Sequence, residues 1–387
     1  YYKINQKEGK FDYITPKAPK GEKPYRFNWQ TPILLSSHNQ DILYMGSEFL
    51  QRSMNQGETW ERISGDLTNG AKEGNVAFGT ISTISESKFQ FGLLYAGSDD
   101  GKIHVSKDGG VSWQLISGNL PQNLWVSRVV ASSHKKERVY VTLNGYRNDN
   151  FESYAFVSED FGATWTSISN GLTQAVNVIV EDSANENILY VGTDNGLFIS
   201  VDKGANWQDF SNGMPKVAIH DAVIQTKAKE LIVGTHGRSI YKMDISKVQE
   251  LTKDVLAKNL HLFKVNDRTK SERWGSQNYA WGKPSEPSQT IWFYSNADGI
   301  VNVSITNEAG MLVHAQKVEA KKGLNSFAYD YLLSKEVAEK WNKKDKNIKI
   351  KEAENKKFYL PVGKYKMTVS KDKVTETKSF EVTAPKK

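Results

Sequence analysis

Four segments of the chain carry the same short motif, Ser-x-Asp-x-Gly-x-x-Trp. They are SMNQGETWERI from Ser53, SKDGGVSWQLI from Ser106, SEDFGATWTSI from Ser158 and SVDKGANWQDF from Ser200. The first copy carries Asn55 in place of the aspartate. Self-similarity of this kind is the signature of repeat architectures, so we expect the chain to fold as a series of similar units.

A second element lies upstream of the motif in each unit. It reads LYMGS (43–47), LYAGS (94–98), VYVTL (139–143), LYVGT (189–193) and LIVGT (231–235), at spacings of 42 to 51 residues. Such short β-branched and aromatic runs predict strands, and the spacing suits a four-stranded propeller blade. The predicted fold class is all-β, with a β-propeller, closed or incomplete, over residues 1–250. It would hold about five blades plus a remnant.

The residue types of the motif fit a tight turn between two strands. An aspartate side chain can accept backbone N–H groups across the turn, glycine supplies a positive φ, and the tryptophan begins the next strand and packs between blades. We therefore assign structural roles, not catalytic ones, to the motif residues Asn55, Asp108, Asp160, Asp202, Trp60, Trp113, Trp165 and Trp207. We expect Trp113, Trp165 and Trp207 to be largely buried.

The pattern changes near residue 250. Residues 251–289 are expected to connect the propeller to a second domain, and residues 290–387 read as six or seven short strands with turn signals, which predicts an Ig-like β-sandwich. The lysine-rich stretch 332–357 interrupts this pattern, and we expect a surface helix with an exposed loop there.

Composition excludes several classes of protein. The chain has no cysteine, so disulfides and cysteine-based sites are excluded. No apolar run is long enough for a membrane span. The net charge is +7, but the lysines of 335–357 alternate with acids, so we expect no nucleic-acid partner. The seven histidines are scattered, and we expect neither a metal nor a cofactor.

The repeats resemble the Asp boxes of BNR-repeat proteins, which include sialidases, two-propeller xyloglucanases and the sortilin-type receptor propeller. The stretch from PYRFNWQTPILLS to ELIVGTHGRSIYKMDIS resembles a family of large bacterial secreted proteins labelled sortilin-like or glycosyl hydrolase. ITNEAGMLVHAQKVEAKKGLNSFAYD and LPVGKYKMTVS resemble FlgD-type Ig-like modules. This resemblance implies a secreted, cell-surface or periplasmic location. It also implies that residues 1–16 are the outer strand pair of an earlier blade.

Antiparallel strands place the Asp boxes on one face of a propeller and the opposite turns on the other face, around the channel. That second face is where we expect a ligand. The candidate binding residues on it are Trp125, Arg128, Tyr146, Arg147, Asp149, His220, Asp221, His236 and Arg238.

Two functions remain open at this point. One is a binding scaffold whose propeller face recognises a protein or a glycan. The alternative is a glycoside hydrolase, either sialidase-like with arginines drawn from Arg128, Arg147 and Arg238, or xyloglucanase-like with a carboxylate pair drawn from Asp99, Asp149 and Asp221. Its site would be shared with further propeller sequence.

The edge of the first unit, around residues 31–36 and 43–47, is expected to need a cover. Further sequence of the same polypeptide or another chain would cover this edge, because exposure of an apolar sheet face to water is unfavourable. The alternative is a compact ring closed by pairing residues 1–16 with residues 239–246.

Overall fold

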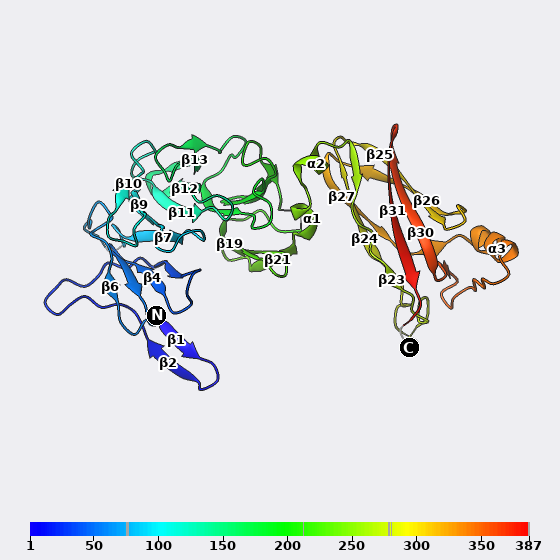
Figure 1. Cartoon of the computed structure of the whole chain (residues 1–387), viewed down its shortest axis with the longest axis horizontal. Coiled ribbons are helices and arrows are strands. Elements are labelled where there is room, and N and C mark those ends of the chain that lie inside the picture. The colour runs from blue at the N-terminus through cyan, green and yellow to red at the C-terminus, as the bar shows by residue number, and fades with distance from the viewer. Residues whose placement is uncertain (75–76, 212, 278, 280, 386–387) are drawn as a thin grey trace. The chain divides into compact units, whose positions relative to one another are not determined.

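The computed structural model describes residues 1–74, 77–211, 213–277, 279 and 281–385 and divides into two compact units, Tyr1–Gln249 and Glu250–Lys387. Strands make up most of the regular structure in both units (Figure 1). The predicted all-β class is confirmed. In the described part of the chain, no helix is both long and apolar enough to cross a membrane.

The first unit contains a row of antiparallel sheets, which we call blades 1 to 5, with strands A to D in chain order. Blade 1 consists of β3 (Ile33–Leu35), β4 (Leu43–Gly46), β5 (Leu50–Ser53) and β6 (Glu61–Arg62). Blade 2 consists of β7 (Ile81–Glu86), β8 (Leu94–Ser98), β9 (Ile103–Ser106) and β10 (Gln114–Leu115). Blade 3 consists of β11 (Trp125–Ala131), β12 (Val139–Gly145), β13 (Asn150–Ser158) and β14 (Thr166–Ser167).

Blade 4 has the same form, and blade 5 has three strands among the described residues. Blade 4 consists of β15 (Val176–Glu181), β16 (Leu189–Thr193), β17 (Gly196–Ser200) and β18 (Gln208–Asp209). Blade 5 consists of β19 (Ile219–Gln225), β20 (Glu230–Thr235) and β21 (Ile240–Asp244). The A strands β7, β11, β15 and β19 contact one another in succession, so the blades stack side by side as in a β-propeller.

A two-stranded hairpin, β1 (Tyr2–Asn5) and β2 (Lys10–Tyr13), precedes blade 1. Within the described residues its strands pair only with each other, and β21 pairs only with β20. The compact closure between residues 1–16 and 239–246 is therefore not formed.

Each Asp box is a turn held by its own side chains. In the third box, Asp160 accepts a hydrogen bond from the Thr164 N–H at 2.9 Å and from the Ser158 hydroxyl at 2.7 Å. Gly162 has a φ of +88°, which favours glycine. Hydrogen bonds, first from the Thr164 hydroxyl, lower the pKa of Asp160 to about 2. Asn55 in the first box accepts the equivalent N–H of Thr59 at 2.9 Å.

The box tryptophans tie blades 2 to 4 to the blade before each of them, and blade 1 to the segment that follows the hairpin. Their indole N–H groups donate to the carbonyls of Ile14, Ile63, Ile116 and Ile168 at 2.6–2.8 Å, from Trp60, Trp113, Trp165 and Trp207 respectively. Trp113, Trp165 and Trp207 pack against buried clusters of the blades and keep only a minor part of their surface exposed, in agreement with the expectation.

The second unit is a sandwich of two sheets around one core. One sheet contains β22 (Leu260–Leu262), β24 (Gln289–Ser295) and β27 (Gly323–Tyr329). The other contains β23 (Arg268–Thr269), β31 (Val374–Thr383), β30 (Gly363–Lys371), β25 (Gly299–Asn307) and β26 (Leu312–Ala320). Phe293 and Tyr329 of the first sheet share a buried cluster with Val303 and Met367 of the second. Part of the segment 251–289 thus belongs to this sandwich, since it supplies β22 and β23.

Short elements complete the two units. The first unit ends with α1 (Ser246–Gln249), and the second unit also contains α2 (Lys253–Leu256), β28 (Leu332–Leu333), α3 (Lys335–Lys344) and β29 (Phe358–Tyr359). The helix α3 lies in the lysine-rich stretch. Its N-cap Ser334 accepts the Val337 N–H, and Ala338 and Trp341 are buried, which leaves the lysine side facing solvent.

Candidate functional site

A β-bulge recurs at the same place in the A strands of blades 2 to 5. The pairing shifts between Ile81 and Thr83, and it shifts at the equivalent positions of β11, β15 and β19. A bulge re-aims the extra side chain and is common next to functional sites. Here the bulged residues, Ser82, Ser127, Asn177 and His220, all line one cavity of about 870 Å³.

We call this cavity the inner-strand pocket. Its wall includes the bulged residues, residues 28–34 at the start of blade 1, residues of the turns at the same end of blades 3 and 4, and Asp221 of β19. Trp29 in this segment is 81% exposed, so its ring is available to a ligand. The pocket combines aromatic, amide and charged side chains, which is the composition expected of a site for a polar ligand.

Arg147 is fixed on one side of the inner-strand pocket. It belongs to η1 (Tyr146–Asn148), and its guanidinium lies 4.2 Å from the centroid of the Trp125 ring. Arg147 also pairs with Asp99 at 3.3 Å. Asp99 is 2% exposed and accepts hydrogen bonds from the Thr80 N–H and the Asn28 amide. Burial raises the pKa of Asp99, whereas Arg147 and the Thr80 N–H lower it.

Arg128 and Asp221 form an ion pair between blades 3 and 5. Arg128 Nη2 lies 2.7 Å from Asp221 Oδ1, and both side chains line the inner-strand pocket. The Nε of Arg128 is buried and makes no hydrogen bond with described residues. The pair spans the A strand of blade 4, so it links two blades that are not neighbours.

Histidine and amide side chains form the remaining side of the pocket. The rings of His220 and His236 lie 5.2 Å apart between centroids. Burial lowers the pKa of His220, the charge of His236 lowers it further, and Asp194 opposes them. Asn144 donates to Asn177 at 2.7 Å, and Asn177 donates to Asp194 at 2.8 Å, so these amides are held in fixed orientations.

The structure brings six of the nine candidate binding residues together in this pocket. They are Trp125, Arg128, Tyr146, Arg147, His220 and Asp221. The other three do not line it: Asp149 is the exposed left-handed cap of η1, Arg238 is exposed, and the ring of His236 lies beside that of His220. Sequence reasoning missed Asn28, Trp29, Ser82 and Ser127, because neither a bulge nor the path of a leading loop has a clear sequence signal.

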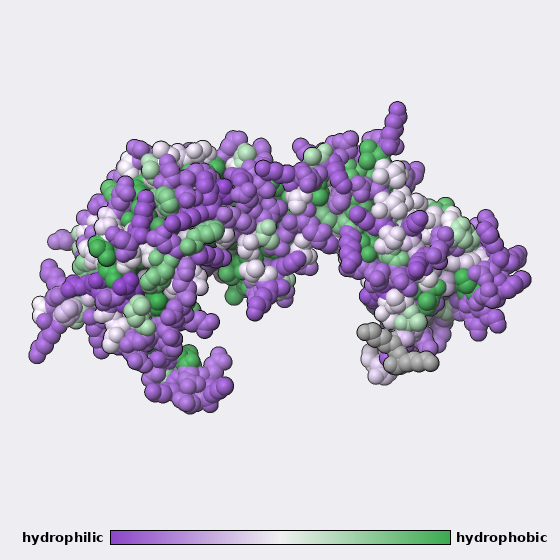
Figure 2. Space-filling view, viewed as in Figure 1, coloured by the Kyte–Doolittle hydropathy of each residue, from purple (hydrophilic) through white to green (hydrophobic). Residues whose placement is uncertain are grey.

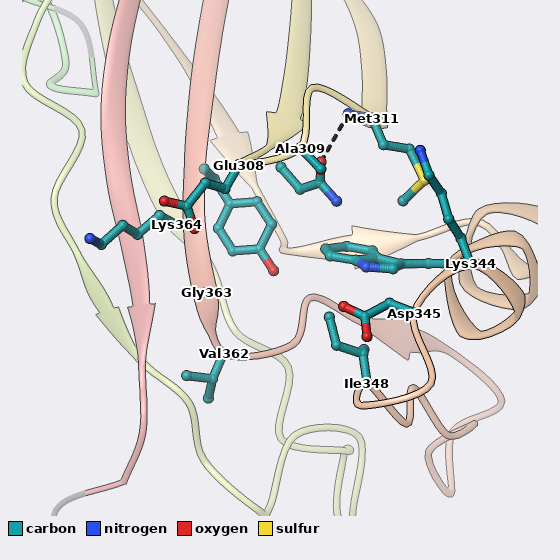
Figure 3. A pocket seen from close by; sticks show the side chains of 12 residues that line it. Glu308, Ala309, Met311, Lys344, Asp345, Ile348, Val362, Gly363 and Lys364 are labelled. Atoms are coloured by element: carbon teal, nitrogen blue, oxygen red, sulfur yellow. Dashed lines mark hydrogen bonds between the residues drawn. The ribbon is translucent and has the colours of Figure 1, made fainter.

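A second cavity, of about 570 Å³, lies in the sandwich unit (Figure 3). Lys344 and Asp345 at the end of α3 face Glu308 and Ala309 of the turn between β25 and β26, and Val362 lies below them. The Met311 N–H donates to Asn307 Oδ1 at 2.8 Å and shapes that turn. The charges on its wall have both signs, so the cavity does not select for ligand charge.

The carboxylates at the inner-strand pocket are engaged with other side chains. Of the two that line it, Asp221 is bound by Arg128 and Asp194 by Asn177, whereas Asp99 does not line it and is bound by Arg147. Among the described residues, no group of three or more His, Asp or Glu side chains is placed to bind a metal ion. The pocket wall thus combines aromatic faces, amides and arginines that are held by ion pairs.

Comparison with known proteins gives one family match and several structural likenesses. The Sortilin-Vps10 model, described as sortilin, neurotensin receptor 3, matches residues 48–175. Similar solved structures include an ancestral GH74 enzyme, with 16% identity and a TM-score of 0.45, covering 81% of this chain and 40% of that one. PorZ, an essential bacterial surface component of the type-IX secretion system of Porphyromonas gingivalis, has 15% identity and a TM-score of 0.42, covering 91% and 51%.

The Cps50 (Swd1) β-propeller domain of Myceliophteria thermophila has 13% identity and a TM-score of 0.43, covering 77% of this chain and 89% of that one. No curated protein matches the sequence. The chain spans less than two thirds of the GH74 enzyme and of PorZ. The sheet topology defines the class of this protein, an all-β protein with propeller blades, and a shared fold does not carry an activity with it.

Proposed function

We propose that the chain is a secreted or cell-surface bacterial binding protein whose propeller recognises a protein or glycan ligand at the inner-strand pocket. One observation carries the proposal: the pocket joins exposed aromatic rings and amide groups to two carboxylates that are already engaged, Asp221 with Arg128 and Asp194 with Asn177. A hydrolase needs a carboxylate free to protonate or attack. The Asp99 side chain is fully buried and cannot reach a substrate.

The family match supports the same proposal from another direction. The model that matches residues 48–175 describes a receptor, and this range covers Trp125, Arg128, Tyr146 and Arg147. A receptor propeller binds without turnover. The location proposed here, outside the cytoplasm, is checked by fractionating the cells that produce the protein and probing each fraction with an antibody.

The test is a binding screen of the whole chain against glycan and peptide arrays. For a ligand found in this way, Arg128→Ala should raise the Kd about tenfold or more, because it removes a charged donor and its paired geometry from the pocket. Arg238→Ala is the matched control, since Arg238 is an exposed arginine outside the pocket and should leave the Kd unchanged. Equal affinity of the two variants would contradict the proposed site.

The second candidate is a glycoside hydrolase, favoured by the exposed Asp221 at the pocket. Two carboxylates within about 10 Å of each other across a groove would serve such chemistry. Turnover of an array glycan by the wild type, lost in Asp221→Asn, would establish the hydrolase and overturn the binding proposal. Binding without turnover supports the first candidate.

A further inference from the structure

The cavity of about 570 Å³ in the second unit, which we call the sandwich cavity, lies where three segments meet. They are the β25–β26 turn, the end of α3 with the residues after it, and the start of β30. The lining includes the aliphatic side chains of Met311, Ile348 and Val362 and the rings of Trp341 and Tyr365, which pack edge to face with centroids 6.3 Å apart. Figure 2 shows a small hydrophobic area on this unit beside the hydrophilic surface of α3. The cavity therefore has the size and the surface to receive a large apolar group.

Two largely buried side chains of this lining carry hydrogen-bond donors that are not used. Asn307 is 8% exposed, and its Oδ1 accepts the Met311 N–H at 2.8 Å, whereas its Nδ2 donates to no described residue. Trp341 is 6% exposed, and its indole N–H has no acceptor in the described part of the chain. A donor removed from water without an acceptor is unfavourable. These two donors therefore favour a ligand that brings acceptor oxygens into the cavity.

The charged groups of the wall favour a ligand that is neutral but polar. Glu308 and Lys344 form no ion pair with a described residue, and Asp345 accepts only the Asn347 N–H, at 3.0 Å, within the same part of the chain. In Figure 3 the Lys364 side chain extends away from the other lining residues. Carboxylates accept N–H groups, and the two unused donors require carbonyl oxygens. The main-chain peptide group supplies both.

A strand edge without a partner begins directly beside this cavity. Strand β26 pairs with β25 and with no other described strand. It starts immediately after Met311, and its first residue, Leu312, is 52% exposed. Residues 312–316 include no lysine, arginine, aspartate or glutamate, whereas Lys317 and Glu319 follow. Charged side chains protect edge strands against strand addition, so the half of β26 next to the cavity is the half that an extended chain could join.

We propose that the sandwich cavity binds an extended peptide segment of a partner protein. One bulky apolar side chain of the peptide enters between Met311, Ile348 and Val362. Its neighbouring main-chain carbonyls accept hydrogen bonds from Asn307 Nδ2 and Trp341 Nε1, and the chain continues along the start of β26. A sugar fits this site less well, because Trp341 is buried and presents no open ring face on which a pyranose could stack. The inference concerns the second unit alone and does not depend on the function proposed for the inner-strand pocket.

The experiment selects a phage-displayed library of random linear peptides on the whole chain and titrates the enriched peptides in synthetic form. We expect them to share one large aliphatic or aromatic residue and no common charge. Ala309→Trp places a large ring at the exposed turn that lines the cavity and should raise the Kd of these peptides about tenfold or more. Ala328→Trp, at an exposed alanine of β27 outside the lining, is the matched control and should leave the Kd unchanged. Val362→Trp serves as the filling variant if Ala309→Trp does not fold.

Two further variants test the hydrogen bonds separately from the fit. Asn307→Asp keeps the oxygen that accepts the Met311 N–H but replaces the unused donor by an acceptor, so the Kd should rise about tenfold or more. Trp341→Phe keeps most of the ring and loses the N–H, and the Kd should rise about threefold to tenfold. In the ¹⁵N-labelled wild type, the indole N–H signal of Trp341 should shift when an enriched peptide is added.

Several results would overturn the proposal. They are a selection that enriches no peptide, peptides bound equally by the wild type and the filling variants, and an unchanged Kd in Asn307→Asp. Peptides whose affinity falls in Arg128→Ala but not in Ala309→Trp would occupy the inner-strand pocket, which contradicts this inference and supports the function proposed above. Binding that is lost in the filling variants and retained in Arg128→Ala supports the sandwich cavity, whatever the outcome at the other site.

Discussion

The side chain that holds the Asp-box turn differs between blades, and this difference can be tested by pH. Hydrogen bonds, largest from the Thr164 hydroxyl, lower the folded pKa of Asp160 to about 2, below its ordinary value of 3.8. Its contribution to stability is therefore complete above about pH 4 and is lost as the pH falls toward 2. Asp160→Asn copies the natural Asn55 box and should flatten this part of the pH profile, measured by urea unfolding from pH 2 to 6. A profile identical to that of the wild type would show that the carboxylate is not engaged.

The box tryptophan is the second residue whose contribution can be separated. Trp165 packs against the buried cluster that blades 2 and 3 share, and it donates to the Ile116 carbonyl at 2.8 Å. Trp165→Ala should lower the free energy of unfolding by about 2–4 kcal/mol, less than for a fully buried ring. Trp165→Phe keeps most of the ring contact and should lose only about 1 kcal/mol with the hydrogen bond. Urea unfolding at pH 7 measures both, and equal stabilities of the two variants would argue against the inter-blade contact.

At the scale of the element, the glycine of the B strand controls how closely the next blade approaches. A methyl group on Gly192 would lie 2.6 Å from Ile219 Cγ2 of blade 5, whereas one on the equivalent Gly234 meets no atom closer than 3.7 Å. Gly192→Ala should therefore cost about 1–3 kcal/mol of unfolding free energy through overpacking. Gly234→Ala, the matched control, should change it by about 0.5 kcal/mol or less. Thermal unfolding compares the two, and a cost at Gly234 would mean that another sheet packs on blade 5.

Buried acids add a second link between neighbouring blades. Glu181 of blade 4 accepts from the Ser132 hydroxyl, the Ser133 N–H and the Tyr140 hydroxyl of blade 3. Glu86 of blade 2 repeats this set with Ser36, Ser37 and Tyr44 of blade 1. Blades 1 and 2 are therefore joined by the same set of hydrogen bonds as blades 3 and 4. Self-comparison of the Asp boxes alone does not indicate this pairing of blades.

At the scale of the whole molecule, the sandwich unit has a core of its own. Its buried cluster runs from Leu260 to Val382 and draws on both sheets. Residues 250–387 expressed alone should therefore unfold in one cooperative transition, because a domain with its own core can fold independently. Circular dichroism and the dispersion of NMR amide signals check this. A disordered spectrum for the isolated segment would show that it needs the propeller.

The sequence alone determined the blades, because their signals are local. The residues of the Asp box determine a turn, and the Leu-Tyr-x-Gly pattern determines a buried strand. Each of these structures depends on only a few consecutive residues. The same reasoning gave six of the nine candidate residues that line the inner-strand pocket, since antiparallel order fixes the end of a blade at which a turn lies.

Only the tertiary structure decided which of these residues meet. Arg128 pairs with Asp221 across 93 positions of sequence, and Asn28 reaches Asp99 across 71. Such contacts depend on how the blades stack and on bulges that turn Ser82 and Ser127 inward, and neither depends on local sequence. The small exposed part of each box tryptophan has the same origin: residue type predicts that a ring packs, whereas the position of the neighbouring blade sets how much of the ring is covered.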